Sequence, residues 1–378
     1  MAFTREAYTD AISEFKTKLP YKQVPYSKKN WGHKWHSVSS YQGKMKPAIA
    51  HWLVKMFSLE NERVLDPLGG SGTIPFEACL QGRVGITNDL SPFAATLGAA
   101  KMNVPNINQV LDEIREIQFF MEQKVLTEIE MKSAEFGLNS PVKDYFHEDT
   151  LKEILKLRIY FRENLNWDPP QNLIRANILH ILHGNRPYAL SRKSHSLTPY
   201  KPSGEFIYKS VMDKLLERIE KLYQEEFPTS YCEGEYYYGN FNTLSSKIDP
   251  VDCVITSPPF VGMRFDRQNW MRMWFMGWEE CDFLNPSSEF LERKQHKNWD
   301  IYKEFFEICS NRLKSKGRLI LHLGGSMKYD MVSEIHSRAT EHFDFIDDVF
   351  EEVGDSEKHG IKDKGTTNQH IYLFFQKK

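Results

Sequence analysis

The chain has 378 residues, of which 40% are hydrophobic, 26% charged and 13% aromatic, with a formal net charge of −2. This composition is typical of an ordinary globular protein and excludes a disordered tail, a collagen and a small disulfide-rich scaffold. No stretch approaches the ~18 consecutive apolar residues of a membrane span, and the first residues lack the basic-then-apolar layout of a signal peptide. We therefore expect a cytoplasmic protein with no membrane partner.

Cysteine and histidine spacing indicates neither disulfides nor a metal site. The five cysteines lie far apart without a Cys-x-x-Cys pair, which favours buried thiols. No metal-ligand spacing with carboxylates or cysteines is found for the histidines His33, His36, His183 and His195. We predict no metal.

Charge is distributed unevenly along the chain. Residues 1–60 carry ten Lys and Arg against four Asp and Glu, whereas residues 341–357 are crowded with acids. A basic face would suit a polyanion, because phosphate neutralisation supplies most of the sequence-independent affinity for nucleic acid. Charges scattered over a solvated surface are the alternative.

The first recognisable unit is a strand over 63–67, a glycine loop over 68–72 and a helix over 73–81. A second strand spans 84–89, and Ser91 is placed to cap the helix that follows. This order is the opening of a nucleotide-type α/β unit.

Further strands are expected later in the chain, at 251–256, 317–323 and 369–375. Strands that alternate with helices predict an α/β fold with a doubly wound, mostly parallel sheet. Between them, helical spacing of apolar residues covers 107–131, 149–164 and 172–183, and residues 183–214 are irregular, basic and aromatic. We predict a mainly helical, basic insertion for target recognition at 104–235 between two parts of the core, 1–103 and 236–378.

The glycine loop Asp66-Pro67-Leu68-Gly69-Gly70-Ser71-Gly72-Thr73 carries the first chemical signal. Its glycines let backbone N–H groups approach a ligand closely. No lysine follows Gly72, so the loop is not a phosphate-binding P-loop. Asp66 would repel a pyrophosphate but suits an ammonium group, and Asp89 is placed to accept hydrogen bonds from ribose hydroxyls. Together they favour a nucleoside that carries an amino acid; a tight turn without a ligand is the alternative.

The second signal is Thr256-Ser257-Pro258-Pro259-Phe260, at the carboxyl end of a buried strand. Two prolines cannot extend the strand, and they hold the turn rigid at the functional edge of the sheet. The Ser257 hydroxyl, the Pro258 carbonyl and the Phe260 ring suit a planar base with an exocyclic amine: the ring stacks, and the two acceptors bind the amine hydrogens. Such acceptors favour a pyramidal nitrogen in the transition state.

These residues resemble the S-adenosylmethionine-dependent amino-methyltransferases of DNA, which modify N4 of cytosine or N6 of adenine. The resemblance covers about residues 30–103 and 236–325, including a stretch, 36–47, similar to the segment that contacts the methionine end of the cofactor. It implies a Rossmann-like class I methyltransferase fold, a flipped target base and S-adenosylmethionine as cofactor. The catalytic residues implied are Ser257, Pro258, Pro259 and Phe260. The cofactor-binding residues implied are Tyr41, Gln42, Lys44, Asp66, Pro67, Gly69, Gly70, Gly72, Thr73 and Asp89.

Two positions depart from the family pattern. Leu68 stands where an aromatic residue is usual. The acid that binds the cofactor adenine is expected near 238–242, where the chain offers Asn240 and Asn242. In the resembled family a serine before the two prolines is typical of enzymes that methylate N4 of cytosine, so the resemblance implies cytosine through Ser257.

Double-stranded DNA is the implied partner, and a cognate restriction endonuclease is left open. Backbone contacts are predicted for two sets of basic residues, Arg186, Arg192 and Lys193 in the insertion and Arg264 and Arg267 after the catalytic turn. In the same stretch, Trp270 and Trp274 are expected in the core. The rival functions are an N6-adenine enzyme, an RNA or protein amide methyltransferase, and a nonenzymatic DNA-binding protein.

Overall fold

The computed structural model describes residues 3–164, 166–246, 248–326, 330–352 and 367–378. Within these residues the chain forms one seven-stranded sheet with the strand order β3-β2-β1-β4-β5-β7-β6. The strands are β1 (Arg63–Asp66), β2 (Val84–Asp89), β3 (Glu235–Tyr238), β4 (Val251–Thr256), β5 (Leu313–Ser326), β6 (Phe343–Glu352) and β7 (Thr367–Lys377).

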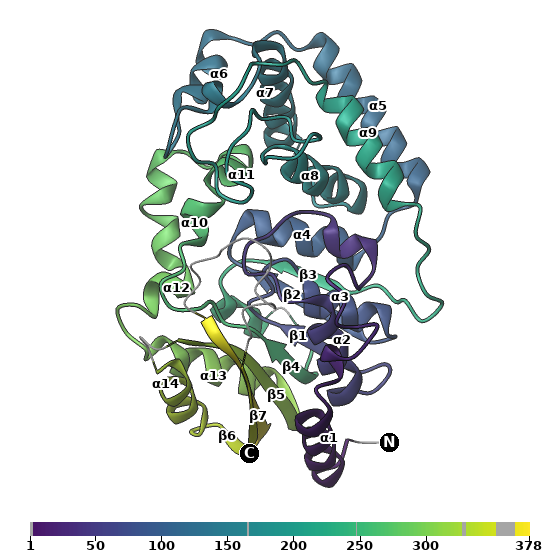
Figure 1. The fold of residues 1–378 in the computed structure, drawn as a ribbon, viewed down its shortest axis with the longest axis vertical. Coiled ribbons are helices and arrows are strands. Elements are labelled where there is room, and N and C mark those ends of the chain that lie inside the picture. The colour runs from purple at the N-terminus through teal and green to yellow at the C-terminus, as the bar shows by residue number, and fades with distance from the viewer. Residues whose placement is uncertain (1–2, 165, 247, 327–329, 353–366) are drawn as a thin grey trace.

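Helices cover both faces of the sheet and extend beyond one end of it (Figure 1). Those around the sheet are α1 (Arg5–Lys18), α2 (Pro47–Phe57), α3 (Thr73–Leu80), α4 (Pro92–Met102), α13 (Ile301–Arg312) and α14 (Met331–Ala339). Those beyond its end are α5 (Ile107–Gln123), α6 (Glu128–Lys132), α7 (Glu148–Glu163), α8 (Pro169–Ile181), α9 (Val211–Leu222) and α11 (Trp270–Phe275). Two short helices, α10 (Phe265–Gln268) and α12 (Leu291–Lys294), join the two regions along one side.

Apolar side chains on both faces of the central strands explain why the sheet lies between two helical layers. Val64 and Ile255 pack with α1 and α2, whereas their neighbours Leu65 and Val254 pack with α13 and α14. Strands buried on both faces read as continuous apolar runs, which is the pattern of parallel sheets. β1 to β5 are indeed parallel neighbours, and β7 alone runs in the opposite direction, antiparallel to both of its neighbours, β5 and β6.

The predicted fold class is confirmed: this is a Rossmann-like, doubly wound, mostly parallel sheet. The strand order reverses between β1 and β4, because the chain passes from β1 outward to β3 and then returns to the other side of β1. In such sheets the crevice at the reversal, outside the carboxyl ends of the strands, is where ligands bind.

Several element bounds differ from the sequence prediction. The helix expected over 107–131 is two helices, since residues 124–127 are not helical. The basic segment 183–214 ends in a helix that the sequence reading missed, α9, whose N-cap Ser210 accepts a hydrogen bond from the Asp213 N–H. β5 is also longer than expected, because the strand continues through Gly324 and Gly325 to pair with β7.

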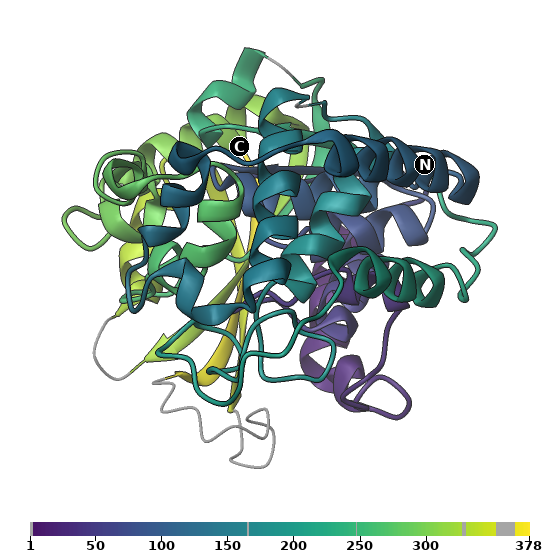
Figure 2. The ribbon, with the colours of Figure 1, turned by 90° about the horizontal axis from the view of Figure 1, so that it is seen from above.

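The helices beyond the sheet share one core with α4. Buried residues of α4, α5, α7, α8, α9 and α11 belong to a single hydrophobic cluster. Figure 2 shows these helices lying across one end of the molecule. As expected, Trp270 and Trp274 are buried in this cluster. The boundaries at 104 and 235 stay predictions.

The acidic segment after Glu341 supplies an edge strand, which the sequence reading also missed. On β6, Asp344 pairs with Arg5 and Asp347 with Lys16, at 3.2 and 3.0 Å. A charged edge strand is protected against pairing with another chain. The acids of the described part therefore complement the basic N-terminal region.

Two cysteines depart from the expectation of buried thiols, because Cys281 is exposed and Cys232 is half-buried. Among the described residues there is no cluster of ligands that could hold a metal ion. The helices described are all too short or too polar to cross a membrane.

Candidate active site

One cavity lies at the carboxyl ends of β1, β2 and β4, on the side that faces the helices beyond the sheet. Its empty volume is about 1100 Å³, open solvent at the mouth included. Small-molecule sites occupy about 300–1,000 Å³. It is lined by nearly all the residues that the sequence assigned to cofactor and catalysis: Tyr41, Gln42, Lys44, Asp66, Pro67, Gly69, Gly70, Thr73, Asp89, Asn240, Ser257, Pro258, Pro259 and Phe260.

Two predicted cofactor residues stand apart from this set. Gly72 does not line the cavity and instead caps α3 with a left-handed backbone, φ +68°. Asn242 is exposed and outside the lining, whereas Asn240 lines it.

The glycine loop is held by backbone geometry that only glycine permits. A Cβ on Gly69 would lie 2.0 Å from the Thr87 hydroxyl oxygen, and a Cβ on Gly70, where φ is +51°, would lie 3.3 Å from the Tyr41 hydroxyl oxygen. Both positions therefore require glycine, because Thr87 and Tyr41 approach the loop backbone closely. The N–H of Gly70 donates to the Asp89 carboxylate at 2.8 Å.

Asp89 links the glycine loop to α4. One of its oxygens accepts from Gly70 and the other from the Ser91 N–H, each at 2.8 Å. Burial raises the pKa of Asp89 to about 6, although these hydrogen bonds favour its ionised form. Each carboxylate oxygen has two lone pairs, so both can still accept from a ligand hydroxyl.

Asp66 connects the glycine loop to the end of β4. Its Oδ1 accepts from the Thr256 hydroxyl at 2.7 Å and from the Leu68 N–H at 3.1 Å. Burial raises the pKa of this carboxyl to about 7, so a cation placed against it would favour its ionised form again. The two motifs that the sequence separates by about 190 residues are thus bonded to each other.

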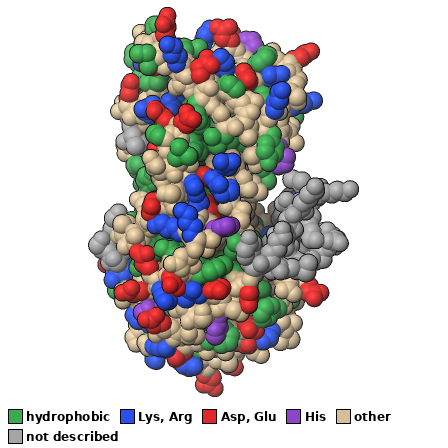
Figure 3. All heavy atoms as spheres, turned by 90° about the vertical axis from the view of Figure 1, so that its left-hand side faces the viewer, with side chains coloured by type: hydrophobic (Ala, Val, Ile, Leu, Met, Phe, Trp, Pro, Cys, Tyr) green, Lys and Arg blue, Asp and Glu red, His purple; other side chains and the backbone are tan. Residues whose placement is uncertain are grey.

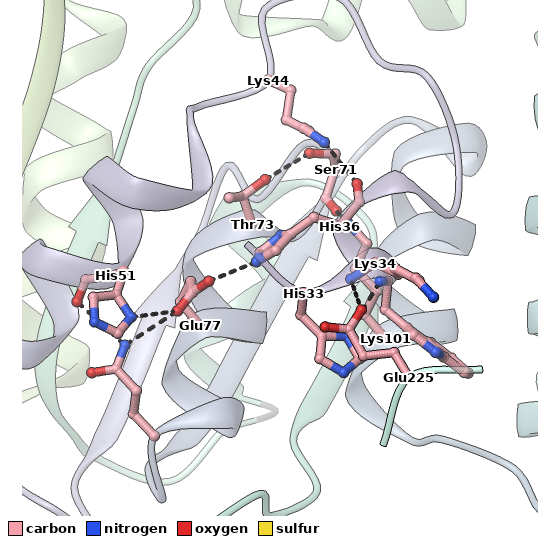
Figure 4. Close-up of polar contacts among 12 residues, drawn as sticks. His33, Lys34, His36, Lys44, His51, Ser71, Thr73, Glu77, Lys101 and Glu225 are labelled. Carbon is pink, nitrogen blue, oxygen red and sulfur yellow. Dashed lines mark hydrogen bonds and ion pairs between the residues drawn. The ribbon is translucent and has the colours of Figure 1, made fainter. Parts of the chain in front are cut away.

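The segment 36–47 is tied to α3 and α2 by a buried carboxylate. Glu77 accepts from the His36 ring at 2.7 Å and from the His51 ring at 3.1 Å (Figure 4). In the same region the Lys44 ammonium donates to the His36 carbonyl at 2.7 Å, and burial lowers the pKa of Lys44 to about 8. These contacts position Tyr41 and Lys44 at the cavity.

A second buried lysine lies behind the glycine loop. Lys101 of α4 is 1% exposed and donates to the Ser71 carbonyl, and the hydroxyls of Ser71 and Thr73 are 3.0 Å apart (Figure 4). Burial lowers the pKa of Lys101. The Lys101 ammonium thus satisfies the Ser71 carbonyl and ties the glycine loop to α4.

The turn from Ser257 to Phe260 is fixed by residues far away in the sequence. Gln295 donates to the Pro259 carbonyl at 2.9 Å and accepts from the Tyr302 hydroxyl at 2.7 Å. The Phe260 ring packs against Gly324, where an added Cβ would lie 2.7 Å from the ring. The Ser257 hydroxyl lies 3.1 Å from the Nδ1 atom of His322 on β5.

Sequence reasoning missed a further set of cavity and turn residues. Glu292 of α12 lines the cavity with a buried Oε1 atom that has no hydrogen-bond partner in the described residues. Burial, with Asp89 and Asp266 nearby, raises its pKa to about 7. Met263, Phe265 and Phe290 also line the cavity. No motif or spacing marks these residues.

The predicted nucleic-acid residues lie in two separate places. Arg186, Arg192 and Lys193 line another cavity, which shares no lining residue with the first. Two backbone carbonyls engage the Arg192 guanidinium, those of Asp144 at 2.9 Å and Gly204 at 2.8 Å. The roles assigned to these residues stay predictions.

Arg264 and Arg267 flank the first cavity. Arg264 is paired with the buried Asp266 at 3.0 Å, and Arg267 is exposed. Figure 3 shows the face that forms the left-hand side of Figure 1, where α10 and α12 lie. Lys and Arg side chains gather at the narrow middle of this face. Arg272, by contrast, is buried and donates to Leu179 and Ser40, so it holds α11 against the insertion and the segment 36–47.

A second large cavity, which we call the basic cavity, adjoins the first and shares Lys44 and Met45 with it. Its basic lining residues are Lys22, Lys28, Lys29, Lys34, Lys44, Lys46, His33, His36 and His370. Glu351 is the acid in its lining and pairs with Lys22 at 2.7 Å. Lysines so placed create a positive potential beside the first cavity.

Residues 34–134 match the family model described as RMKL-like, methyltransferase domain. This match marks that part of the chain, which includes the glycine loop, as belonging to a methyltransferase domain. No curated protein matches the chain.

The chain is also similar to solved structures, including one from Thermus thermophilus and one from Streptomyces viridochromogenes. TrmN from Thermus thermophilus is 11% identical over 91% of this chain and 53% of its own, with a TM-score of 0.35. The chain therefore spans about half the length of that protein. The rRNA methyltransferase AviRa from Streptomyces viridochromogenes is 8% identical over 90% of this chain and 89% of its own, with a TM-score of 0.34.

Proposed function

We propose that the chain transfers a methyl group from S-adenosylmethionine to the exocyclic amine of a nucleic-acid base. The observation that carries this proposal is that one cavity is lined jointly by the glycine loop, by Asp89 and by the turn from Ser257 to Phe260. A methyl donor and an amine acceptor must meet in one space, because direct transfer needs both in near-attack geometry.

The residues at one end of the cavity fit the cofactor. Asp89 retains lone pairs for the ribose hydroxyls, and Asp66 offers a carboxyl whose ionisation a cationic group would favour. The buried Gln42 Oε1 has no hydrogen-bond partner in the described residues and lies in the lining, as an acceptor for a ligand donor. S-adenosylmethionine supplies an electrophilic methyl group.

The other end fits a planar base. Phe260, seated on Gly324, offers a ring face for stacking, and Ser257 and the Pro258 carbonyl offer acceptors to the two amine hydrogens. Acceptors that draw on these hydrogens expose the nitrogen lone pair as the nitrogen becomes pyramidal. The chain itself forms no covalent bond in this mechanism, and it acts by orientation and hydrogen bonding.

The substrate proposed is double-stranded DNA, with N4 of cytosine as the methylated atom. The serine before the two prolines supports cytosine through the resemblance described above, and the basic cavity supports a polyanion. The same features would serve an RNA strand, so RNA is the second substrate that the experiment must include.

The test is methyl transfer from labelled S-adenosylmethionine, with duplex DNA, single-stranded DNA, RNA and a protein mixture as separate acceptors. Digestion to nucleosides then identifies the methylated atom. N4-methylcytosine in DNA is the expected product. N6-methyladenine would correct the base, methylated RNA would correct the polymer, and transfer to protein alone or to none of these acceptors would overturn the proposal.

A further inference from the structure

The hydroxyl of Ser257 and the rings of His322 and His370 form a continuous row of hydrogen bonds. Ser257 Oγ lies 3.1 Å from His322 Nδ1, and His322 Nε2 lies 3.0 Å from His370 Nδ1. The two histidines stand on the adjacent strands β5 and β7. The row begins at the first cavity, which Ser257 lines, and ends at the basic cavity, which His370 lines.

We propose that this row is a proton relay that carries the surplus proton of the methylated amine from Ser257 to solvent in the basic cavity. The inference rests on the proposed function, because it assigns the relay to an amine bound at Ser257. It goes beyond the catalytic turn, since His322 and His370 act through Ser257 and do not touch the base.

The ring geometry admits one arrangement of protons that leads outward. The Ser257 hydroxyl donates to His322 Nδ1, and the Nε2–H of His322 donates to His370 Nδ1. His322 must then be neutral, and burial together with His370 holds its pKa well below the ordinary value. The lone pairs of the Ser257 oxygen are left to face the amine.

The step balances in atoms and charge. The amine nitrogen forms a bond to the methyl carbon as the carbon–sulfur bond breaks, and that electron pair stays on sulfur. The nitrogen is then positively charged and loses one proton to Ser257 Oγ. Ser257 passes its own proton to His322 Nδ1, and His322 passes its Nε2 proton to His370 Nδ1. His370 gives up its Nε2 proton on the side of the basic cavity, which it lines, and the proton leaves to the solvent there. The three side chains end with their original net charge.

The surroundings hold the relay in place. The Tyr372 ring lies 5.1 Å from the His322 ring, and Phe260 lies 6.4 Å from it with its edge toward the ring. His322 is 4% exposed, so bulk water does not compete for its Nδ1 atom. A hydroxyl alone is a weak base, and a neutral imidazole hydrogen-bonded to it makes it a competent proton acceptor.

The kinetic test uses the full chain, with the nucleic acid that the wild-type protein methylates. His322→Gln and His370→Gln should each lower the single-turnover rate about 10- to 100-fold. The KM for nucleic acid and the calorimetric affinity for S-adenosylhomocysteine should stay within about twofold. His336→Gln, a histidine on α14 outside both cavities, is the matched control and should keep the wild-type rate.

Two further readouts separate a relay from a structural role. The double variant Ser257→Ala/His322→Gln should lose little more single-turnover rate than the slower of the two single variants. Removing either group already breaks the relay, so the two effects are not additive. The 15N spectrum of histidine-labelled protein at pH 7.5 should show His322 neutral, with its proton on Nε2. This second readout needs no nucleic acid.

The outcomes are distinguishable. Full turnover in His322→Gln, beside an active wild-type protein, would overturn the relay and leave the proposed function standing. A proton on Nδ1 of His322 would overturn it as well. A wild-type protein inactive on every nucleic acid would overturn the proposed function and, with it, the role of the relay, even if the tautomer is as expected.

Discussion

The two ends of the first cavity are built in different ways. The end assigned to the cofactor comes mainly from one stretch, β1 through the start of α4, with the segment 36–47 packed against it. The end assigned to the amine is assembled from the turn after β4 together with Gln295, next to α12, and His322 of β5, which lie 36 and 65 residues away from the turn residues that they contact. Local backbone geometry builds the first end, and tertiary packing builds the second.

This difference has an energetic counterpart. At the cofactor end, Asp89 and the glycine loop satisfy each other with backbone hydrogen bonds that form with the βαβ unit itself. At the amine end, Gln295, Gly324 and His322 must all be in place before Ser257 and Phe260 are oriented. We therefore expect changes at the amine end to reduce turnover and changes at the cofactor end to reduce cofactor affinity.

The largest effect is expected when the amine end loses both of its side-chain groups, the Ser257 hydroxyl and the Phe260 ring. Ser257→Ala/Phe260→Ala should lower single-turnover methyl transfer on the order of 10³-fold, since a hydrogen-bond acceptor and a stacking face are both removed. Affinity for S-adenosylhomocysteine, measured by calorimetry, should change little. Phe119→Ala, an exposed phenylalanine of α5, is the control. Full activity in the double variant would remove this turn from the active site.

The next effect concerns the cofactor end. Asp89→Ala should weaken S-adenosylhomocysteine binding by about 1.5 to 3 kcal/mol, because a charge-assisted acceptor is lost. Asp89→Asn should cost less, since its amide oxygen can still accept one loop N–H. Asp112→Ala, in an exposed pair with Arg115, should bind like the wild-type protein. Undiminished affinity in Asp89→Ala would show that the ribose does not bind there.

A smaller effect should appear in the pH dependence of cofactor affinity. Burial raises the pKa of Asp89 to about 6, so this carboxyl takes up a proton as the pH falls through 6 and loses its charge. If binding uses the carboxylate, affinity should fall up to about tenfold per pH unit below that pKa. Calorimetric titrations at pH values from 7.5 to 5 should show this fall in cofactor affinity in the wild-type protein and not in Asp89→Asn. Equal profiles would assign the dependence to another group, such as Asp66.

The smallest effect separates the two basic regions. Lys28→Ala/Lys29→Ala, in the basic cavity, should reduce the salt dependence of DNA binding by about two counterions. Arg192→Ala/Lys193→Ala should reduce it less, because backbone carbonyls already engage the Arg192 guanidinium. The slope of log K against log salt measures both. A larger change in the second pair would return DNA recognition to the insertion.

The sequence by itself determined the features that depend on neighbouring residues. The strand, glycine loop and helix over 63–81 follow from apolar runs and from backbone conformations that only glycine adopts. Ser91 caps α4 as predicted, its hydroxyl accepting from the Ala94 N–H at 3.3 Å. The carboxyl ends of parallel strands share one edge, so the sequence could also bring the glycine loop and Ser257 together.

Only the tertiary structure decided which distant side chains complete the site. Glu292, Gln295 and His322 leave no periodic or spaced trace in the sequence, because their contacts bridge separate elements. The lysines of the basic cavity were visible only as the excess of Lys and Arg in residues 1–60, and the fold decided that they gather beside the first cavity. The sequence did not predict β6 for a related reason. Its charged side chains form ion pairs with Arg5 and Lys16 of α1, more than 300 residues away. A pattern within one element reports that element's own burial, whereas these roles depend on what the fold places opposite it.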